Sequence, residues 1–140
     1  MTNDADYDAL LVERSRKRAE YQACESRIDE CDYLLRRLRT AKEEIVAQKA
    51  AYRKLIKTEQ GIIDQKYAWK GESYDSYCRN ANEVQRENAF YLNYSLDRAL
   101  DTLNNRITEI ENKRLREFGL LGQLASALNY LSNSIENFFN

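Results

Sequence analysis

The sequence predicts an all-α protein, a long antiparallel two-helix hairpin of coiled-coil type that completes a helical bundle with a partner. Two observations predict this fold class. The 140 residues include no Pro and only four Gly, which are the residues that break a chain into short strands and tight turns. Apolar residues recur at steps of three and four through both halves of the chain, a spacing that indicates amphipathic helices.

The first helix is expected over about residues 4–67. Thr2, Asn3 and Asp4 are candidate capping residues. Beyond them, the apolar residues keep one coiled-coil phase, in the order Tyr21, Cys24, Ile28, Cys31, Leu35, Leu38, Ile45, Tyr52, Ile56 and Ile63. Three charged residues fall on the same seam, Lys42, Lys49 and Glu59, and three apolar residues lie beside it, Ala41, Leu55 and Ile62. An apolar face of this width is typical of helical bundles rather than of two-stranded coils.

A turn is expected at residues 68–73, because Gly71 accepts the left-handed geometry that ends a helix and Ser73 can cap the next one. The second helix then covers about residues 74–139. Its apolar residues continue at the same spacing through Gly119 and Gly122, so we expect it to be continuous or gently kinked near 119–122. The two helices have similar lengths, and the whole chain 1–140 is predicted to form a single helical-hairpin domain.

The C-terminal part of the second helix is the predicted binding surface. Residues 118–140 contain one charged side chain, Glu136. If the helices pair about a turn near residue 70, the apolar stripe there faces a charged stretch at residues 13–18 and is only half covered. We therefore expect a partner helix to bind the stripe, with packing against the N-terminal arm and membrane contact as the alternatives. The stripe consists of Leu121, Leu124, Leu128, Leu131, Ile135 and Phe138.

Composition argues against several other functions. With 22 basic and 23 acidic residues well mixed, no net field attracts nucleic acid or anionic lipid; the basic clusters at 14–18 and 36–39 are interpreted as solvated ion-pair faces. The absence of His removes the usual general base and a common metal ligand, so we expect no enzyme activity, cofactor or metal. No apolar run long enough for a membrane span and no secretory signal are present, which predicts a cytoplasmic protein without stable membrane insertion. The three Cys residues are interpreted as small core residues.

Trp69, Lys70 and Gly71 form a Trp-x-Gly turn between two long amphipathic helices. With the central position of the turn and the matched helices, this pattern resembles the Trp-x-Gly (WXG) helical-hairpin superfamily of bacterial type VII secretion. The length of the chain is closer to its YwqH-like members, which are accessory proteins of LXG-type toxins in Gram-positive bacteria. In such a protein, Trp69 would pack at the tip of the hairpin and Gly71 would permit the tight turn.

The resemblance implies an adaptor that binds the helical N-terminal targeting domain of an LXG toxin and supports its folding, stability or export. A second small helical accessory protein is a further implied partner. The family's export signal, a Tyr followed four residues later by an acid after the second helix, is missing, since Tyr130 is followed by Ser134. The expectation is therefore a cytoplasmic adaptor, or one that leaves the cell with its toxin. The alternative is a self-assembling coiled-coil scaffold, which predicts a homo-oligomer.

Overall fold

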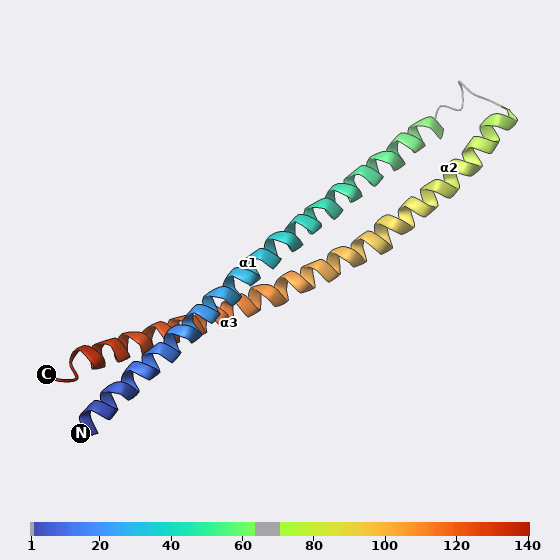
Figure 1. Ribbon diagram of the computed structural model, residues 1–140. Helices are drawn as coiled ribbons and strands as arrows, with labels where there is room; N and C mark the ends of the chain where they lie inside the picture. Colours follow the sequence, from blue (N-terminus) through green and yellow to red (C-terminus); the bar gives the residue numbers. More distant parts are fainter. Residues whose placement is uncertain (1, 64–70) are drawn as a thin grey trace. The chain divides into compact units, whose positions relative to one another are not determined.

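The computed structural model of the chain describes residues 2–63 and 71–140, and within them it contains helices and no strand (Figure 1). Helix α1 spans Thr2–Ile63. The second helical stretch consists of α2 (Glu72–Phe90), a single π-helical turn η1 (Tyr91–Leu96) and α3 (Asp97–Glu136). The all-α helical hairpin predicted from the sequence is confirmed at this level.

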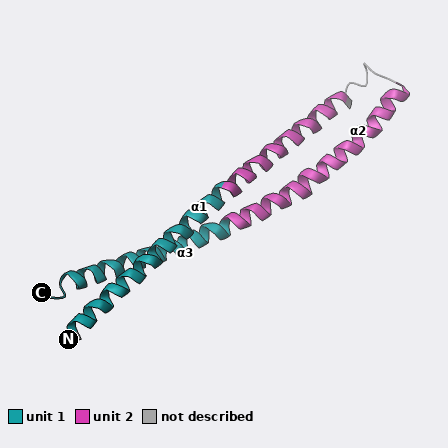
Figure 2. Cartoon of the chain, viewed as in Figure 1, with its two compact units in different colours: residues 1–36, 108–140 teal, residues 37–107 magenta. Residues whose placement is uncertain are grey.

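The chain divides into two compact units, each built from one part of α1 and one part of the second helical stretch (Figure 2). Unit 1 comprises residues 1–36 and 108–140, and unit 2 comprises residues 37–107. None of the described helices carries an apolar stretch of the length that a membrane crossing needs.

Unit 1 is an antiparallel helix pair with a closed apolar core. Its contacts run in opposite directions along the two helices: Tyr7 meets Phe138 near the chain ends, whereas Arg114 binds Asp32 at the far end of the unit. The buried side chains come from both helices. On α1 they are Cys24, Ile28, Cys31 and Leu35, and on α3 they are Ile110, Leu124, Leu131 and Ile135.

The register of unit 1 differs from the expected one by about one helical turn. A turn centred near residue 70 would place Leu124 opposite the charged stretch at 13–18. Instead, Leu124 forms a cluster with Cys24 and Ile28, against which Tyr21 and Leu121 also pack. This register is favourable because it brings the apolar residues of α3 onto the apolar part of α1.

Unit 2 is an antiparallel pair whose core is less complete. Here the buried side chains are Ala81, Leu92, Leu96 and Ile107, all from the second helical stretch. Within residues 37–62 of α1 no side chain is buried. The pairing is fixed by a Tyr52–Tyr91 ring contact at 5.0 Å and by an ion pair between Lys49 and Asp97.

The π-helical turn resolves a change of phase in the second helical stretch. Ala81, Gln85, Asn88 and Leu92 follow one heptad phase, and Leu96, Leu103 and Ile107 follow a phase displaced by one residue. A π-helical turn holds one more residue than an α-helical turn. Leu92 closes the first phase and Leu96 opens the second, and both are buried, at 4% exposure each. The extra residue takes up the one-residue displacement between the two phases.

Candidate helix-docking surfaces

The predicted stripe on α3 faces α1. Leu124, Leu131 and Ile135 are buried, and Leu121, Leu128 and Phe138 are half-buried. The ring of Phe138 lies 5.6 Å from that of Tyr7. A partner that contacts these six side chains therefore has to separate α3 from the N-terminal part of α1.

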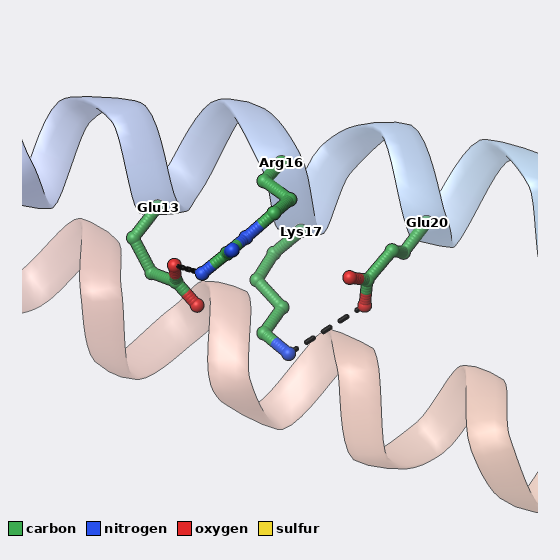
Figure 3. A network of polar contacts seen from close by, with 4 residues as sticks. All are labelled: Glu13, Arg16, Lys17 and Glu20. Carbon is green, nitrogen blue, oxygen red and sulfur yellow. Dashed lines mark hydrogen bonds and ion pairs between the residues drawn. The ribbon is translucent and has the colours of Figure 1, made fainter.

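The charged stretch of α1 contributes to unit 1 through long side chains that pair along the helix. Glu13 binds Arg16, and the Lys17 Nζ lies 3.5 Å from the Glu20 carboxylate. In Figure 3 the Lys17 side chain extends from α1 toward α3. Arg14 and Lys17 are half-buried, as expected when the methylene groups of basic side chains cover an apolar neighbour while their charges remain in water. Glu13, Arg16, Lys17 and Glu20 thus form ion pairs along the helix, as the sequence predicted for this stretch.

The outer side of α3 carries an exposed apolar patch with small residues at its centre. Leu115 and Phe118 are 68% and 42% exposed. Gly119 and Gly122 continue the same face, since residues three and four apart are neighbours on a helix. A Cβ atom added at either glycine would meet no atom within 4 Å. We call Leu115, Phe118, Gly119 and Gly122 the outer patch.

One edge of the outer patch is held by charged groups. The Arg114 guanidinium lies over the Phe118 ring, 4.6 Å from its centre, and also binds the Asp32 carboxylate. A cation over an aromatic face is attracted to the ring's quadrupole. Phe118 is thereby fixed in place while much of its surface remains accessible.

A polar cluster closes the seam of unit 1 beside the outer patch. The Cys24 thiol donates to the Glu117 backbone carbonyl at 3.1 Å and reaches its carboxylate at 3.3 Å, and the Arg27 Nε donates to that carboxylate at 3.0 Å. Burial is the main cause that raises the pKa of the Cys24 thiol, and the hydrogen bond with Glu117 is the second. The Arg27 hydrogen bond is the main cause that lowers the pKa of Glu117. Cys24 is thus a neutral core residue rather than a reactive thiolate.

Two members of the predicted turn motif, Trp69 and Lys70, lie outside the described residues. The third, Gly71, precedes α2 with φ 106° and ψ −167°, a conformation essentially restricted to glycine. Its carbonyl accepts the first helical hydrogen bond, from the Asp75 amide at 3.1 Å. Gly71 is thus the residue before α2, and it does not have the left-handed helical conformation expected at the end of the first helix. Ser73, which was expected to cap the second helix, lies inside it, because α2 begins at Glu72.

Unit 2 exposes apolar side chains beside its seam. Leu55 of α1 is 56% exposed and Val84 of α2 is 47% exposed. The seam itself includes polar contacts: besides the Lys49–Asp97 ion pair, the Tyr77 hydroxyl donates to the Glu59 carboxylate at 3.2 Å. Desolvation is the main cause that raises the pKa of Tyr77, and this hydrogen bond is the second. Among the residues that the structure describes, no group of His, Cys, Asp and Glu side chains is arranged to hold a metal ion.

Ala41, Leu55 and Ile62 are evident beside the seam in the sequence, whereas their counterparts on the other helix and the outer patch were not predicted. The missing signals were present. Tyr77, Val84 and Tyr91 repeat every seven residues, and Leu115 with Phe118 adjoins two glycines on one helix face. Both signals become evident once the seam is located, because only then is it known which side of each helix faces its neighbour and which faces solvent.

No protein-family model, curated protein or solved structure matches the chain.

Proposed function

We propose that the protein is an adaptor that binds a helix of another protein on the outer side of α3. Following the resemblance at the Trp-x-Gly motif, the proposed partner is the helical targeting domain of an LXG-type toxin of type VII secretion. The observation that carries the proposal is the outer patch, where exposed Leu115 and Phe118 adjoin bare glycine backbone.

The outer patch suits a helix because small residues let two helix backbones approach closely, while large apolar neighbours supply contact area. The following segment reinforces this interpretation. From Phe118 to Asn140 the only charged side chain is Glu136, although exposed helix faces usually carry many charges. An uncharged, partly apolar outer face favours contact with protein over permanent exposure to water.

In the proposed function, a partner contacts the inner stripe from Leu121 to Phe138 only after it has contacted the outer patch. Its side chains pack against α1 in the free hairpin, so a partner gains access to them only by displacing the N-terminal arm. We therefore assign first contact to the outer patch. Substitutions such as Leu124→Asp do not test binding cleanly, because they also remove a core residue that is 5% exposed.

A bulky residue at Gly122 provides the sharper test. Gly122→Leu adds a side chain in open space on the outer patch, so the hairpin keeps its fold while a docking helix is held away. Gly61→Leu is the matched control, since Gly61 is also helical and equally open but lies in unit 2. Each variant is co-expressed with the tagged helical domain of a toxin encoded beside its gene, and recovery of the complex is measured by affinity capture and size exclusion.

We expect Gly122→Leu to reduce recovery of the complex at least about tenfold, the effect of losing about 1.4 kcal/mol of binding, with circular dichroism unchanged. Gly61→Leu should leave recovery as it is in the unmodified chain. Equal recovery for both variants would refute the outer patch as the contact surface. Failure of the unmodified chain to bind any neighbouring helical domain would refute the adaptor function.

A further inference from the structure

Unit 2 has a mainly apolar side face made by two rows of residues, with one charged residue at its end. We call it the g face, because its members occupy heptad position g, directly before a seam position. In an antiparallel pair the g positions of both helices flank the same side of the seam. On α1 the row is Ala41, Gln48, Leu55 and Ile62, and on the second helical stretch it is Tyr77, Val84, Tyr91 and, after the phase change in η1, Ala99 and Arg106.

The g face differs in charge from the opposite side of α1. One of its nine side chains is charged, Arg106 at the end of the second row, and Gln48 is the one amide among them. The e positions of α1 in unit 2 are Arg39, Val46, Arg53 and Gln60, of which two are cationic. Leu55, Ile62 and Val84 on the g face are 56%, 37% and 47% exposed, so the face with fewer charges also presents large apolar side chains to solvent.

We propose that the g face binds the g face of a second copy of this chain, so that unit 2 forms a symmetric four-helix dimer. A twofold interface brings the same surface of each copy together, and a charged face would repel its copy. The g face limits this repulsion because its one charged side chain, Arg106, lies at its end, at the level of Ala41. The inference does not depend on the proposed adaptor function, which uses the outer patch in unit 1.

The size of the g face is sufficient for a dimer. From Ala41 to Ile62 the row is about 32 Å long at ~1.5 Å per residue, and two neighbouring helices span about 20 Å. Burial of a face of this length and width on both copies removes about 1,300 Å² from water in total. Specific interfaces begin at about 1,000 Å², so the g face exceeds the minimum without help from unit 1.

Two contacts across the seam show which g residues lie at the same level of unit 2. The Gln85 side-chain amide donates to the Gln60 side-chain oxygen at 3.4 Å, and Lys49 forms an ion pair with Asp97. Counted from these contacts along the antiparallel helices, the two rows match in three pairs. The pairs are Ile62 with Val84, Leu55 with Tyr91, and Gln48 with Ala99.

Gln48 decides the orientation of the second copy. A twofold axis perpendicular to the helices, passing through the middle of the α1 row, would set the two α1 rows antiparallel to each other. The Gln48 amide of one copy would then pack against Leu55 of the second copy. Burial of an amide without a hydrogen-bond partner is unfavourable. A twofold axis parallel to the helices instead sets each α1 row against the other copy's second row at the same level. Gln48 then lies over Ala99, whose small side chain leaves the amide room to reach water.

The parallel axis also matches the apolar members of the two rows. Ile62 of one copy meets Val84 of the other, and Leu55 meets Tyr91, so each large apolar side chain covers another. A rotation about an axis parallel to the helices keeps every residue at its own level, so the copies have no freedom to slide. We therefore expect one defined register, with α1 of each copy beside α2 and η1 of the other.

The first experiment measures the mass of the purified full chain by light scattering over a concentration series. The unmodified chain should give twice the mass of one chain. Leu55→Asp and Val84→Asp should each raise the concentration for half-dissociation at least about tenfold. Val46→Asp is the matched control, since Val46 is 50% exposed in the same unit but lies at an e position, and it should leave the mass unchanged.

A second experiment tests the orientation. Two single variants, Ile62→Cys with a tag and Val84→Cys without one, are mixed and mildly oxidised. The mixture should give a covalent dimer of one tagged and one untagged chain, because the two new thiols face each other across the interface. Each variant alone, and the unmodified chain with Cys24 and Cys31 buried and Cys78 half-buried, are the controls. Identical positions lie on diagonal helices, about 13 Å apart for neighbours at 8–10 Å, which is too far for a disulfide.

Loss of the dimer in Leu55→Asp and Val84→Asp but not in Val46→Asp, with cross-linking of the mixture, would support the proposal. A monomer at all concentrations up to about 100 μM, or a dimer that Val46→Asp weakens as much as Leu55→Asp, would overturn it. If an Asp variant loses helicity, the cross-linking result decides. A mixture that stays uncross-linked, or that cross-links no better than either variant alone, refutes the g-face dimer in this orientation.

Discussion

Units 1 and 2 share one helical pattern but use it differently. In unit 1 both helices bury side chains in a common core, with Cys24 and Ile28 of α1 packed around Leu124 of α3. In unit 2 no side chain of α1 between residues 37 and 62 is buried. The first pair of helices satisfies its own apolar surface, and the second leaves part of that surface at the side.

The difference originates in the seam residues of α1. In unit 1 the charged seam positions of α1, Arg14 and Lys17, lie before an unbroken apolar run from Tyr21 to Leu35. In unit 2 the charged positions Lys42, Lys49 and Glu59 are interspersed with apolar ones along the whole seam. A charged group on the seam keeps water nearby or requires a partner, as Lys49 finds in Asp97. Apolar periodicity therefore predicts where a helix lies, but the polarity of the seam decides whether two helices are sufficient to close the core.

Truncation of matched isoleucines should show the largest difference in stability between the two units. Ile28 and Ile45 both lie on the α1 seam, but Ile28 is 6% exposed in unit 1 and Ile45 is half-buried in unit 2. Ile28→Ala should lower the free energy of unfolding by about 3 kcal/mol and Ile45→Ala by about 1 kcal/mol, since the cost follows the buried volume removed. Urea denaturation followed by circular dichroism measures both. Equal losses would mean that the two cores are equally packed.

Replacing a charged seam residue in unit 2 by an apolar one should reduce the difference in stability between the two units. Lys42 is half-buried on the seam of α1, so Lys42→Leu should raise the urea midpoint of unit 2 by the equivalent of about 1 kcal/mol, through added apolar burial. Lys57→Leu makes the same change at an exposed position of the same helix and should alter stability by less than about 0.5 kcal/mol. If both variants gain equally, helix propensity rather than seam polarity explains the difference.

A smaller effect should distinguish the units at acid pH. The hydrogen bond from Arg27, followed by that from Cys24, lowers the pKa of Glu117 in unit 1. A carboxyl whose pKa is lowered on folding stabilises the fold above its unfolded pKa of about 4.3. That contribution is lost as the pH falls through the lower folded pKa.

Urea unfolding between pH 3 and pH 7 should thus show an acid decline for unit 1 that Glu117→Gln flattens. In unit 2 the raised pKa belongs to Tyr77, whose contribution is lost only at alkaline pH, above its unfolded pKa of about 10. An acid decline of the same size in Glu117→Gln would assign the effect to other carboxyl groups.

Sequence periodicity predicted the fold class because long helices repeat one pattern many times. The seam from Tyr21 to Leu35 was identified correctly, and all of its apolar members except Tyr21 are buried. The polar seam positions Lys42, Lys49 and Glu59 were also visible in the sequence. Their effect on unit 2 could not be predicted from one helix, since the covering of a seam depends on the side chains opposite.

The register and the π-helical turn escaped prediction for a related reason. A displacement of about one helical turn keeps the same apolar spacing, so the sequence alone did not place Leu124 beside Cys24. The phase change near Leu92 and Leu96 shifts the pattern by a single residue, which steps of three and four tolerate. Exposure of the outer patch likewise depends on which side of α3 faces α1.

Hydrogen exchange tests the central claim most directly, namely that unit 1 closes its own core and unit 2 does not. Amides that open only with a well-packed core exchange slowly, and those in weakly packed helices exchange through local opening. The measurement is best made on Leu55→Asp, so that self-association does not protect unit 2. We expect amides of residues 24–35 and 110–131 to exchange at least about a hundredfold more slowly than those of residues 41–62 and 74–90. Uniform protection along both helical stretches would contradict the account.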